Sequence, residues 1–353
     1  MAKAKVAIVG TGSRSLLYVN AINALSDKFE LAFMRFRSEE KAARFKSQYG
    51  IPVTTSMDEL YSSKPDFIIA VNNRPDVGKV ALDALKNGFP VLAETPPAES
   101  FEETQELWEV QQKTGVKMLV AENYFAEPGF AAKLEAVKRG YIGDVHSISV
   151  SNTHQYHAIS MMRLFLNARF EQVKMIGKEY LFPLSITQDK NGNPDFSGSK
   201  QTAGRSHVIM EFESGKVGFY DFSIAQYWSI IRSRTMIVQG SRGEIKDEDI
   251  WFMDAGNRPM KSMFQSVSSG GELLHIALGD KILFENPYIG RHVQSIGVAS
   301  MISNMKSYLE TGEAPYSFND AVQDTYLTQV LIKAEQNPYT AIESEKQPWQ
   351  GIQ

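Results

Sequence analysis

The chain has 353 residues, a net charge of −4, and apolar and charged shares of 43% and 22%. A chain of this length exceeds one comfortable hydrophobic core, so we expect two domains, and the composition is that of a globular rather than a disordered protein. Because acidic and basic residues are interspersed and cysteine is absent, we expect no nucleic-acid partner, no disulfide and no thiolate metal site.

The apolar run nearest the N-terminus, residues 6–9, is only as long as a strand and ends at Gly10. It is too short for the apolar region of a signal peptide, and no later stretch approaches the roughly eighteen apolar residues of a membrane span. We therefore expect a soluble, cytoplasmic protein that does not associate with a membrane.

Short β-rich runs and helical patterns alternate over the first third of the chain. The predicted strands are residues 4–9, 29–36, 67–71, 91–94 and 117–121. The predicted helices are residues 16–25, 39–45, 57–62, 76–87 and 101–114. Strict alternation of this kind predicts an α/β fold whose first domain, residues 1–122, has a doubly wound parallel sheet.

The pattern changes in residues 123–353, which we predict to be a second domain. A helix over 130–139 precedes strands at 145–152, 207–213, 216–225 and 234–240, and two helices close the chain at 296–310 and 318–336. We interpret residues 187–204 as a long polar loop and residues 264–290 as irregular. The connections predict an α+β domain with a mostly antiparallel sheet.

The turn after the first strand reads Gly10-Thr11-Gly12-Ser13-Arg14-Ser15. Gly10 permits a tight turn, and Gly12 lets the backbone approach a pyrophosphate at the N-terminus of the next helix. Ser15 replaces the usual third glycine. Because the turn opens a βαβ series, it favours a dinucleotide-binding Rossmann domain over an ordinary strand–helix turn.

The end of the second strand lacks the acidic residue that binds the ribose hydroxyl of NAD. Arg35, Arg37 and Ser38 occur there instead. One of the arginines can face a 2′-phosphate, which favours NADP(H) over NAD(H); the alternative is two solvated arginines. Asn72 and Asn73 follow the third strand, where amides suit ribose hydroxyls, although they are also common turn residues.

The chain resembles the glucose–fructose oxidoreductase, inositol dehydrogenase and rhizopine catabolism (Gfo/Idh/MocA) family. The likeness rests on the order of several segments along the whole chain. They are the N-terminal GxG turn, residues 37–42, Glu94-Thr95-Pro96, residues 121–124, residues 140–145, His157 with Arg163, residues 240–245 and residues 316–324.

This resemblance implies a Rossmann domain followed by an α/β domain with a large open sheet, one face of which lines the active site. The other face commonly packs in homodimers or homotetramers, and the substrates are mostly sugars, polyols and cyclitols. The matching positions add Val71, Glu94, Thr95 and Asn123 to the predicted dinucleotide contacts. The Arg-Ser segment at residues 37–38 often accompanies NADP.

Two proton-relay residues of the family are replaced in this chain. Thr95 stands where family dehydrogenases have the lysine of Glu-Lys-Pro, and Thr153 stands where they have an aspartate. Of that set only His157 remains. An imidazole can take the proton from a hydroxyl during hydride transfer near neutral pH.

His154, Tyr156 and Tyr124 are further candidate catalytic residues. His154 can orient His157 or bind a substrate hydroxyl, and Tyr156 lies between the two histidines; the alternative is that both are structural residues at a helix cap. Tyr124 follows the fifth strand, where it either reaches a ligand or packs between domains. The spacing of the two histidines does not suggest a metal site.

Three functions remain open from the sequence. The first is an NAD(P)-dependent oxidoreductase acting on a sugar, polyol or cyclitol hydroxyl. The second is a glycoside-cleaving enzyme that uses tightly bound NAD(P) transiently, since Glu94-Thr95-Pro96 looks like the lysine-lacking segment of NAD-dependent α-N-acetylgalactosaminidases. The third is a non-catalytic dinucleotide sensor.

Overall fold

The computed structural model describes residues 2–189 and 192–351, and the chain forms two units. The first unit contains the residues up to Pro128 together with Ser268–Leu274 and Asn286–Thr325. The second contains Gly129–Val267, His275–Glu285 and the residues from Tyr326 onward. The chain therefore leaves the first unit and returns to it before it ends.

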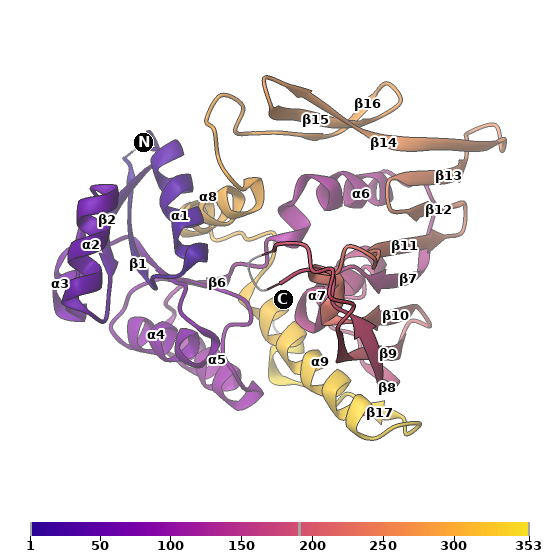
Figure 1. Cartoon of the computed structure of the whole chain (residues 1–353), viewed down its shortest axis with the longest axis horizontal. Helices are drawn as coiled ribbons and strands as arrows, with labels where there is room; N and C mark the ends of the chain where they lie inside the picture. The colour runs from indigo at the N-terminus through magenta and orange to yellow at the C-terminus, as the bar shows by residue number, and fades with distance from the viewer. Residues whose placement is uncertain (1, 190–191, 352–353) are drawn as a thin grey trace. The chain divides into compact units, whose positions relative to one another are not determined.

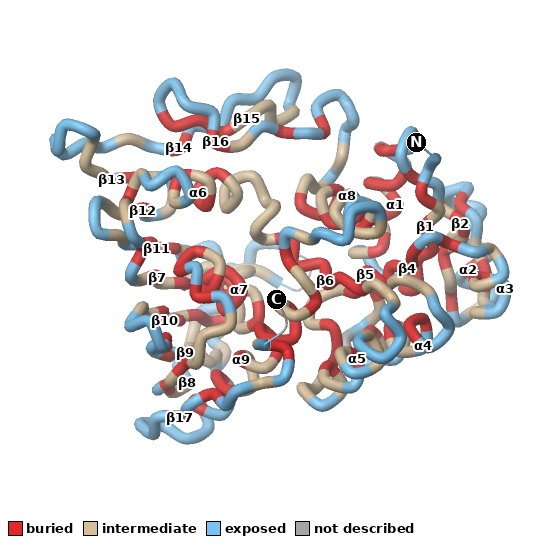
Figure 2. The backbone as a smooth tube through the Cα atoms, turned by 180° about the vertical axis from the view of Figure 1, so that it is seen from behind, coloured by how far each residue is buried: buried red, intermediate tan, exposed pale blue. Residues whose placement is uncertain are grey.

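Within the described residues, the sheet of the first unit has six parallel strands in the order β3-β2-β1-β4-β5-β6 (Figure 1). Its strands are β1 (Ala4–Val9), β2 (Phe29–Arg35), β3 (Val53–Thr54), β4 (Phe67–Ala70), β5 (Val91–Ala93) and β6 (Met118–Val120). The order reverses direction between β1 and β4, and ligands of such sheets bind at this switch point. Strands β4, β5 and β6 are buried along their whole length (Figure 2), as strands covered on both faces are.

Helices connect these strands. They are α1 (Ser13–Ala24), α2 (Glu39–Tyr49), α3 (Met57–Ser62), α4 (Arg74–Lys86) and α5 (Phe101–Thr114), followed by the 3-10 turn η1 (Tyr124–Ala126). Serine side chains cap α2, α3 and α5. Ser100 begins α5 with a capping box to Glu103, and Gly115 ends it in the left-handed conformation. The late helix α8 (Ile296–Thr311) belongs to the same core, where its Val298, Ile302 and Met305 are buried.

The second sheet has eleven strands among the described residues, in the order β16-β15-β14-β13-β12-β11-β7-β10-β9-β8-β17. Its strands are β7 (Val145–Ser151), β8 (Val173–Ser185), β9 (Lys200–Phe212), β10 (Val217–Phe222), β11 (Thr235–Gly240), β12 (Gly243–Lys246), β13 (Asp249–Met253), β14 (Pro259–Ser269), β15 (Glu272–Leu278), β16 (Lys281–Glu285) and β17 (Ile342–Glu343). The recorded pairings are antiparallel except that of β7 with β10.

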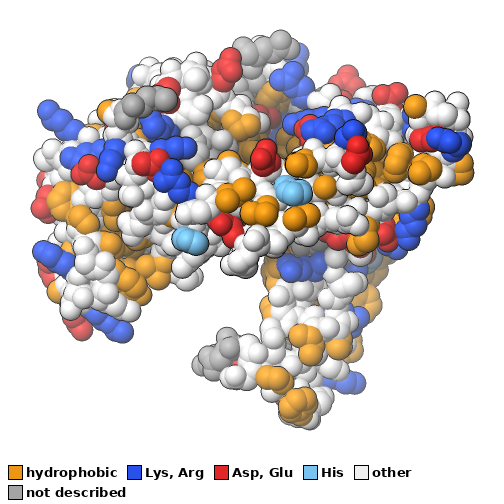
Figure 3. Space-filling view, turned by 90° about the horizontal axis from the view of Figure 1, so that it is seen from above, with side chains coloured by type: hydrophobic (Ala, Val, Ile, Leu, Met, Phe, Trp, Pro, Cys, Tyr) orange, Lys and Arg blue, Asp and Glu red, His pale blue; other side chains and the backbone are white. Residues whose placement is uncertain are grey.

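Helices cover one face of this second sheet (Figure 1). The remaining helical elements are α6 (Pro128–Lys138), α7 (Gln155–Leu166), η2 (Ile224–Tyr227), α9 (Phe318–Gln336) and η3 (Pro348–Gly351). Because only one face is covered, the exposure of side chains alternates along β9. Val208 and Met210 are buried, while Ile209 between them is 45% exposed. Basic and acidic side chains are interspersed over the face of the molecule seen in Figure 3.

The structure confirms the predicted fold class and corrects several elements. Strand β8 lies in a region where we predicted no strand, and β9 begins at Lys200, within the predicted loop 187–204. Residues 190 and 191 of that loop lie outside the described residues. The segment 264–290, predicted to be irregular, contains β15, β16 and the end of β14. Strand β14 and the second half of β8 expose residues on both faces, and β15 buries three successive residues, 276–278, so these sequences lack a sustained alternation.

A search of the described helices for one with the length and hydropathy of a membrane span found none.

Candidate functional site

The turn after β1 contains two glycines, Gly10 and Gly12, which differ in whether the structure leaves room for a side chain. Gly10 has φ 139°, and a Cβ built on it lies 2.2 Å from the carbonyl oxygen of Val71, so no side chain fits there. Gly12 is the N-cap of α1 with ordinary extended geometry, and a Cβ built on it meets no described atom within 4 Å. The helix N-terminus therefore faces open space at Gly12, which is the geometry of a phosphate cradle.

A network of charged and polar side chains lies beside this turn. The guanidinium of Arg14 donates to Glu94 Oε1 (Nε, 2.7 Å) and to Asn123 Oδ1 (3.1 Å). The Tyr18 hydroxyl donates to the same Glu94 oxygen at 2.6 Å, and Asn123 donates to Glu127 at 2.8 Å. The network links the first turn of α1 with the residues that follow β5 and β6.

Burial governs the ionisation of these groups. It raises the pKa of the Tyr18 hydroxyl well above its usual value, and the Glu94 carboxylate adds to this effect. Burial also raises the pKa of Glu127, against the hydrogen bond from Asn123. For Arg14, burial is the largest single effect and acts to lower the pKa, but the charges of Glu94, Tyr18 and Glu127 and the hydrogen bond to Glu94 together outweigh it, so the pKa is raised and Arg14 stays charged.

Two predicted dinucleotide contacts carry polar atoms that find no hydrogen-bond partner in the described part of the chain. They are Oδ1 of Asn72, which follows β4, and Nε of Arg35, the last residue of β2, and both atoms are buried. Arg35 pairs in register with Val9, the last residue of β1, so both orphaned groups lie at the edge of the sheet next to the glycine turn. Asn72 Oδ1 can accept a hydrogen bond from a hydroxyl group, and Arg35 Nε can donate one to a phosphate. A nucleotide bound at this edge carries both kinds of group.

The remaining residues predicted near the second strand serve partly as structure. Ser38 caps α2 by accepting from the Lys41 N–H at 3.4 Å. Arg37 is 66% exposed and forms an ion pair with Asp76 on α4. Asn73 is the N-cap residue of α4, and no side-chain cap bond to it occurs among the described atoms.

In the second unit the structure brings His154 and His157 together at the start of α7. Their rings are 5.0 Å apart between centroids in an edge-to-face arrangement, and both side chains are half-buried. The hydroxyl of Tyr227 lies 2.7 Å from His154 Nδ1 and accepts from the His154 backbone N–H at 3.1 Å. Tyr227 therefore fixes the orientation of the His154 ring.

We call His154, His157 and Tyr227 the histidine cluster. Two neighbouring residues contact it. Thr153, fully buried, shares a 3.1 Å hydrogen bond with Tyr227. Tyr156 is 2% exposed and packs edge-on against His157 at 5.7 Å between centroids. The arrangement offers two imidazoles and a phenol that can hold or pass a proton.

Other predicted residues lie in the first unit. Tyr124 begins η1, and its backbone N–H donates to Glu122 Oε1 at 3.0 Å. Thr95 follows Glu94, and Thr11 and Ser13 belong to the glycine turn.

Four further residues of these networks were not predicted from the sequence: Tyr18, Glu127, Asp76 and Tyr227. Tyr18 lies four residues after Arg14 and thus on the same face of α1, a signal that helical spacing could have provided. Tyr227 lies 73 residues from His154 in the chain, and no local pattern connects them.

Comparison with known proteins agrees with the geometry of the glycine turn. Residues 4–122 match the model of the Gfo/Idh/MocA oxidoreductase family with its NAD-binding Rossmann fold. This part of the chain is therefore similar to the NAD-binding domain of that family. The match to the family covers all six strands of the first sheet.

Curated relatives match part of the chain. An uncharacterized oxidoreductase of Schizosaccharomyces pombe is 28% identical over 145 residues, which are 40% of this chain and 39% of the relative. An L-aspartate dehydrogenase of Methanococcus maripaludis is 25% identical over 159 residues, which are 44% of this chain and 57% of that enzyme. The chain thus matches between about two fifths and three fifths of the length of these relatives.

Solved structures share the fold over nearly the whole chain. An oxidoreductase from Agrobacterium radiobacter in complex with NAD+, L-tartaric acid and magnesium has a TM-score of 0.71 at 14% identity, covering 95% of this chain and 97% of that one. The WlbA dehydrogenase from Bordetella pertussis, in complex with NADH and UDP-GlcNAcA, has a TM-score of 0.67 at 13% identity, covering 98% and 100%. At these identities the likeness concerns the fold of the chain.

The two glycines of the turn predict a contrast between stability and binding. Gly10→Ala is expected to lower the free energy of unfolding by about 2–3 kcal/mol, because a strained φ and an overlap with the Val71 carbonyl are both introduced. Gly12→Ala is expected to cost less than about 1 kcal/mol, while weakening NAD(H) binding about tenfold because its Cβ occupies the cradle. Urea unfolding and calorimetric titration measure the two effects, and equal stability losses in the two variants would contradict the assignment.

Proposed function

We propose that the protein is an NAD(P)-dependent oxidoreductase that acts on a carbon bearing a hydroxyl group, in a sugar, polyol or cyclitol. The glycine turn at Gly10 and Gly12, with open space at the N-terminus of α1, is the observation that carries this proposal. The match of residues 4–122 to the Gfo/Idh/MocA oxidoreductase family supports the proposal. The substrate class follows from the resemblance of the chain to carbohydrate-oxidising members of that family.

Different residues around the turn would bind different parts of a dinucleotide. The backbone at Gly12 and the first turn of α1 would hold the pyrophosphate, and Asn72 and Arg35 would use their orphaned polar atoms on the adenosine side. Glu94 holds Arg14 in place, so the positive charge beside the turn is fixed before a ligand arrives. A bound nicotinamide accepts or donates the hydride in such reactions.

His157 is the residue that we propose to take the substrate proton. Oxidation of a carbinol leaves a developing alkoxide, which must lose its proton to a base within hydrogen-bond reach. His154, oriented by Tyr227, presents its ring edge-to-face to His157 and gives a second proton-carrying group beside it. The relay is therefore assigned to imidazoles, since threonines occupy positions 95 and 153.

A glycoside-cleaving enzyme is the second candidate function. Such an enzyme oxidises a ring hydroxyl with NAD(P)+, eliminates the aglycone after loss of the neighbouring C–H proton, adds water to the unsaturated ketone, and reduces the ketone again with the NAD(P)H formed in the first step, so it needs a second base. The presence of two neighbouring imidazoles, His154 and His157, favours it. Release of a chromophore from a glycoside without net change in reduced nucleotide distinguishes this activity from net oxidation.

We propose NADP(H) as the preferred cofactor, with Arg37 as the residue that recognises the 2′-phosphate. The ion pair of Arg37 with Asp76 weakens this preference, because the Asp76 carboxylate competes for the Arg37 guanidinium and repels the 2′-phosphate. The chain accordingly has the residues to accept both nucleotides, with the balance set by this pair.

Replacement of His157 tests the proposed base. His157→Ala is expected to lower kcat about a hundredfold or more for the substrate identified in a panel of sugars and polyols, while nucleotide affinity stays within a factor of about two. His146→Ala is the matched control, since His146 is an exposed histidine of β7 in the same unit. The absorbance of the reduced nucleotide gives the rate.

Two results would overturn this assignment. Normal turnover in His157→Ala would show that another group takes the proton. Turnover of L-aspartate, but of no hydroxyl compound, would replace the proposed substrate class by an amine-bearing carbon, as in the M. maripaludis relative.

The pair of Arg37 and Asp76 predicts a change in cofactor preference. Asp76→Asn is expected to raise the ratio of NADP(H) to NAD(H) affinity about three- to fivefold, because an exposed ion pair contributes modestly and Arg37 is released from it. Asp58→Asn removes an exposed carboxylate elsewhere in the first unit and serves as control. Calorimetric titration with both nucleotides measures the ratio, and an unchanged ratio would exclude Arg37 as the phosphate contact.

A further inference from the structure

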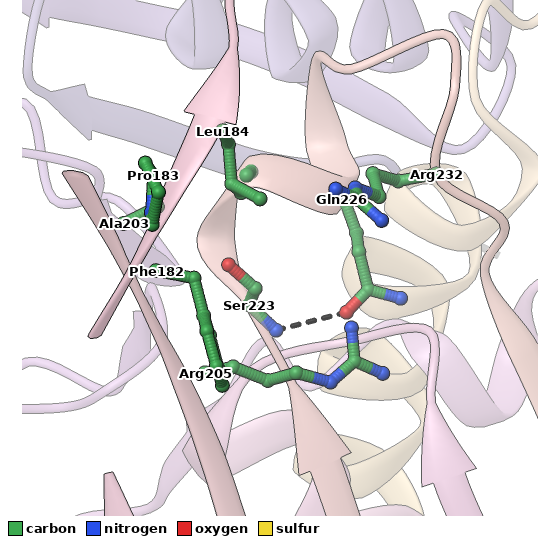
Figure 4. Close-up of a pocket in the computed structure, with 9 residues that line it drawn as sticks. Phe182, Pro183, Leu184, Ala203, Arg205, Ser223, Gln226 and Arg232 are labelled. Atoms are coloured by element: carbon green, nitrogen blue, oxygen red, sulfur yellow. Dashed lines mark hydrogen bonds between the residues drawn. The ribbon is translucent and has the colours of Figure 1, made fainter. Parts of the chain in front are cut away.

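A pocket in the second unit is lined by residues to which no role has been assigned above. Its volume is about 360 Å³, and residues of β8, β9 and the segment after β10 line it (Figure 4). The lining side chains are Phe182, Pro183, Leu184, Ala203, Arg205, Ser223, Ala225, Gln226 and Arg232. Pockets of this volume accommodate small organic ligands.

The pocket opens on the face of the sheet that the helices leave uncovered. Arg205 has the same parity along β9 as the exposed Ile209, and Phe182 pairs across the strands with Ala203. Ser223 directly follows the last residue of β10 and is the N-cap residue of η2. The His154 side chain, by contrast, belongs to the start of α7, so the pocket and the histidine cluster are built from different residues.

The charge of the lining is positive. Its ionisable members are Arg205 and Arg232, with no acidic residue among the lining side chains described. Arg205 forms a bidentate pair with Asp221 (2.5 and 2.7 Å), so its charge is balanced. Arg232 is exposed, and the described carboxylates form no ion pair with it, which leaves one uncompensated positive charge at the pocket.

A buried hydroxyl in this lining lacks an acceptor. Ser223 is 4% exposed and forms a capping box with Gln226, in which its side chain faces the Gln226 backbone N–H and its own N–H donates to Gln226 Oε1 at 2.8 Å. No described atom accepts the hydrogen of the Ser223 hydroxyl. In Figure 4 Ser223 lies between the apolar residues of β8 and the side chains of Gln226 and Arg232.

These features define a ligand with two parts. A buried hydroxyl that lacks an acceptor and a guanidinium that lacks a counter-ion both suit a carboxylate or phosphoryl oxygen. Phe182, Leu184 and Ala203 offer an apolar wall to the rest of the ligand. We propose that this pocket binds an organic anion, in which a carboxylate or phosphate group is attached to an apolar body.

Binding at this pocket does not depend on the proposed oxidoreductase activity. None of its lining residues belongs to the glycine turn, the network of Arg14 and Glu94, or the histidine cluster. The two proposals therefore fail separately, and a direct binding measurement without nucleotide tests this one.

The test is a ligand-observed NMR titration of the full chain with benzoate, phenyl phosphate and benzyl alcohol. The first two probes separate a carboxylate from a phosphate, and the third is of similar shape but uncharged. We expect saturable binding of at least one anion and about tenfold weaker binding of benzyl alcohol, because a charge-assisted hydrogen bond is lost. Absence of saturable binding by both anions at millimolar concentration overturns the proposal.

Variants locate the binding in the pocket. Arg232→Met and Ser223→Ala are each expected to weaken the bound anion about tenfold or more, while His157→Ala binds it as the parent chain does. Arg139→Met is the matched control, since Arg139 is a surface arginine of the same unit outside the pocket. Equal weakening by Arg139→Met and Arg232→Met, or none by Arg232→Met, shows nonspecific anion binding and overturns the proposal. Because Arg232 is exposed, its replacement leaves the fold intact even if Ser223→Ala does not.

Discussion

The close approach of the Gly10 backbone to the carbonyl of Val71 is the constraint on which the first unit depends. It holds the exit of β1 against the exit of β4, the neighbouring strand at the switch point of the sheet. Helix α1 then starts at Gly12 with its N-terminus facing open space. A side chain at position 10 would separate the two strand ends, and the partial positive charge of the helix would lose its place at the edge of the sheet.

Charge near this edge is balanced within the protein before any ligand binds. Glu94 accepts hydrogen bonds from both Arg14 and Tyr18, and Arg37 pairs with Asp76. The arginines are therefore partly neutralised. In the proposed nucleotide complex, backbone amides and the helix N-terminus would then provide much of the attraction for a diphosphate, and the neutral Asn72 would contact the sugar part.

The histidine cluster of the second unit is held by neutral hydroxyl groups. Thr153 shares a hydrogen bond with Tyr227, whose hydroxyl also contacts His154. A neutral phenol thus orients the imidazole, where a carboxylate would stabilise its charged form.

The sequence by itself determined the alternation of strands and helices in residues 4–120, the glycine turn and the ends of capped helices such as α5, because these depend on local periodicity and turn geometry. Only the tertiary structure decided the return of α8 to the first core, the strands β8 and β14–β16, and the contact of Tyr227 with His154. Strands with exposed residues on both faces carry no alternating pattern. Partners far apart in the chain meet only through the pairing of a whole sheet, which local sequence does not encode.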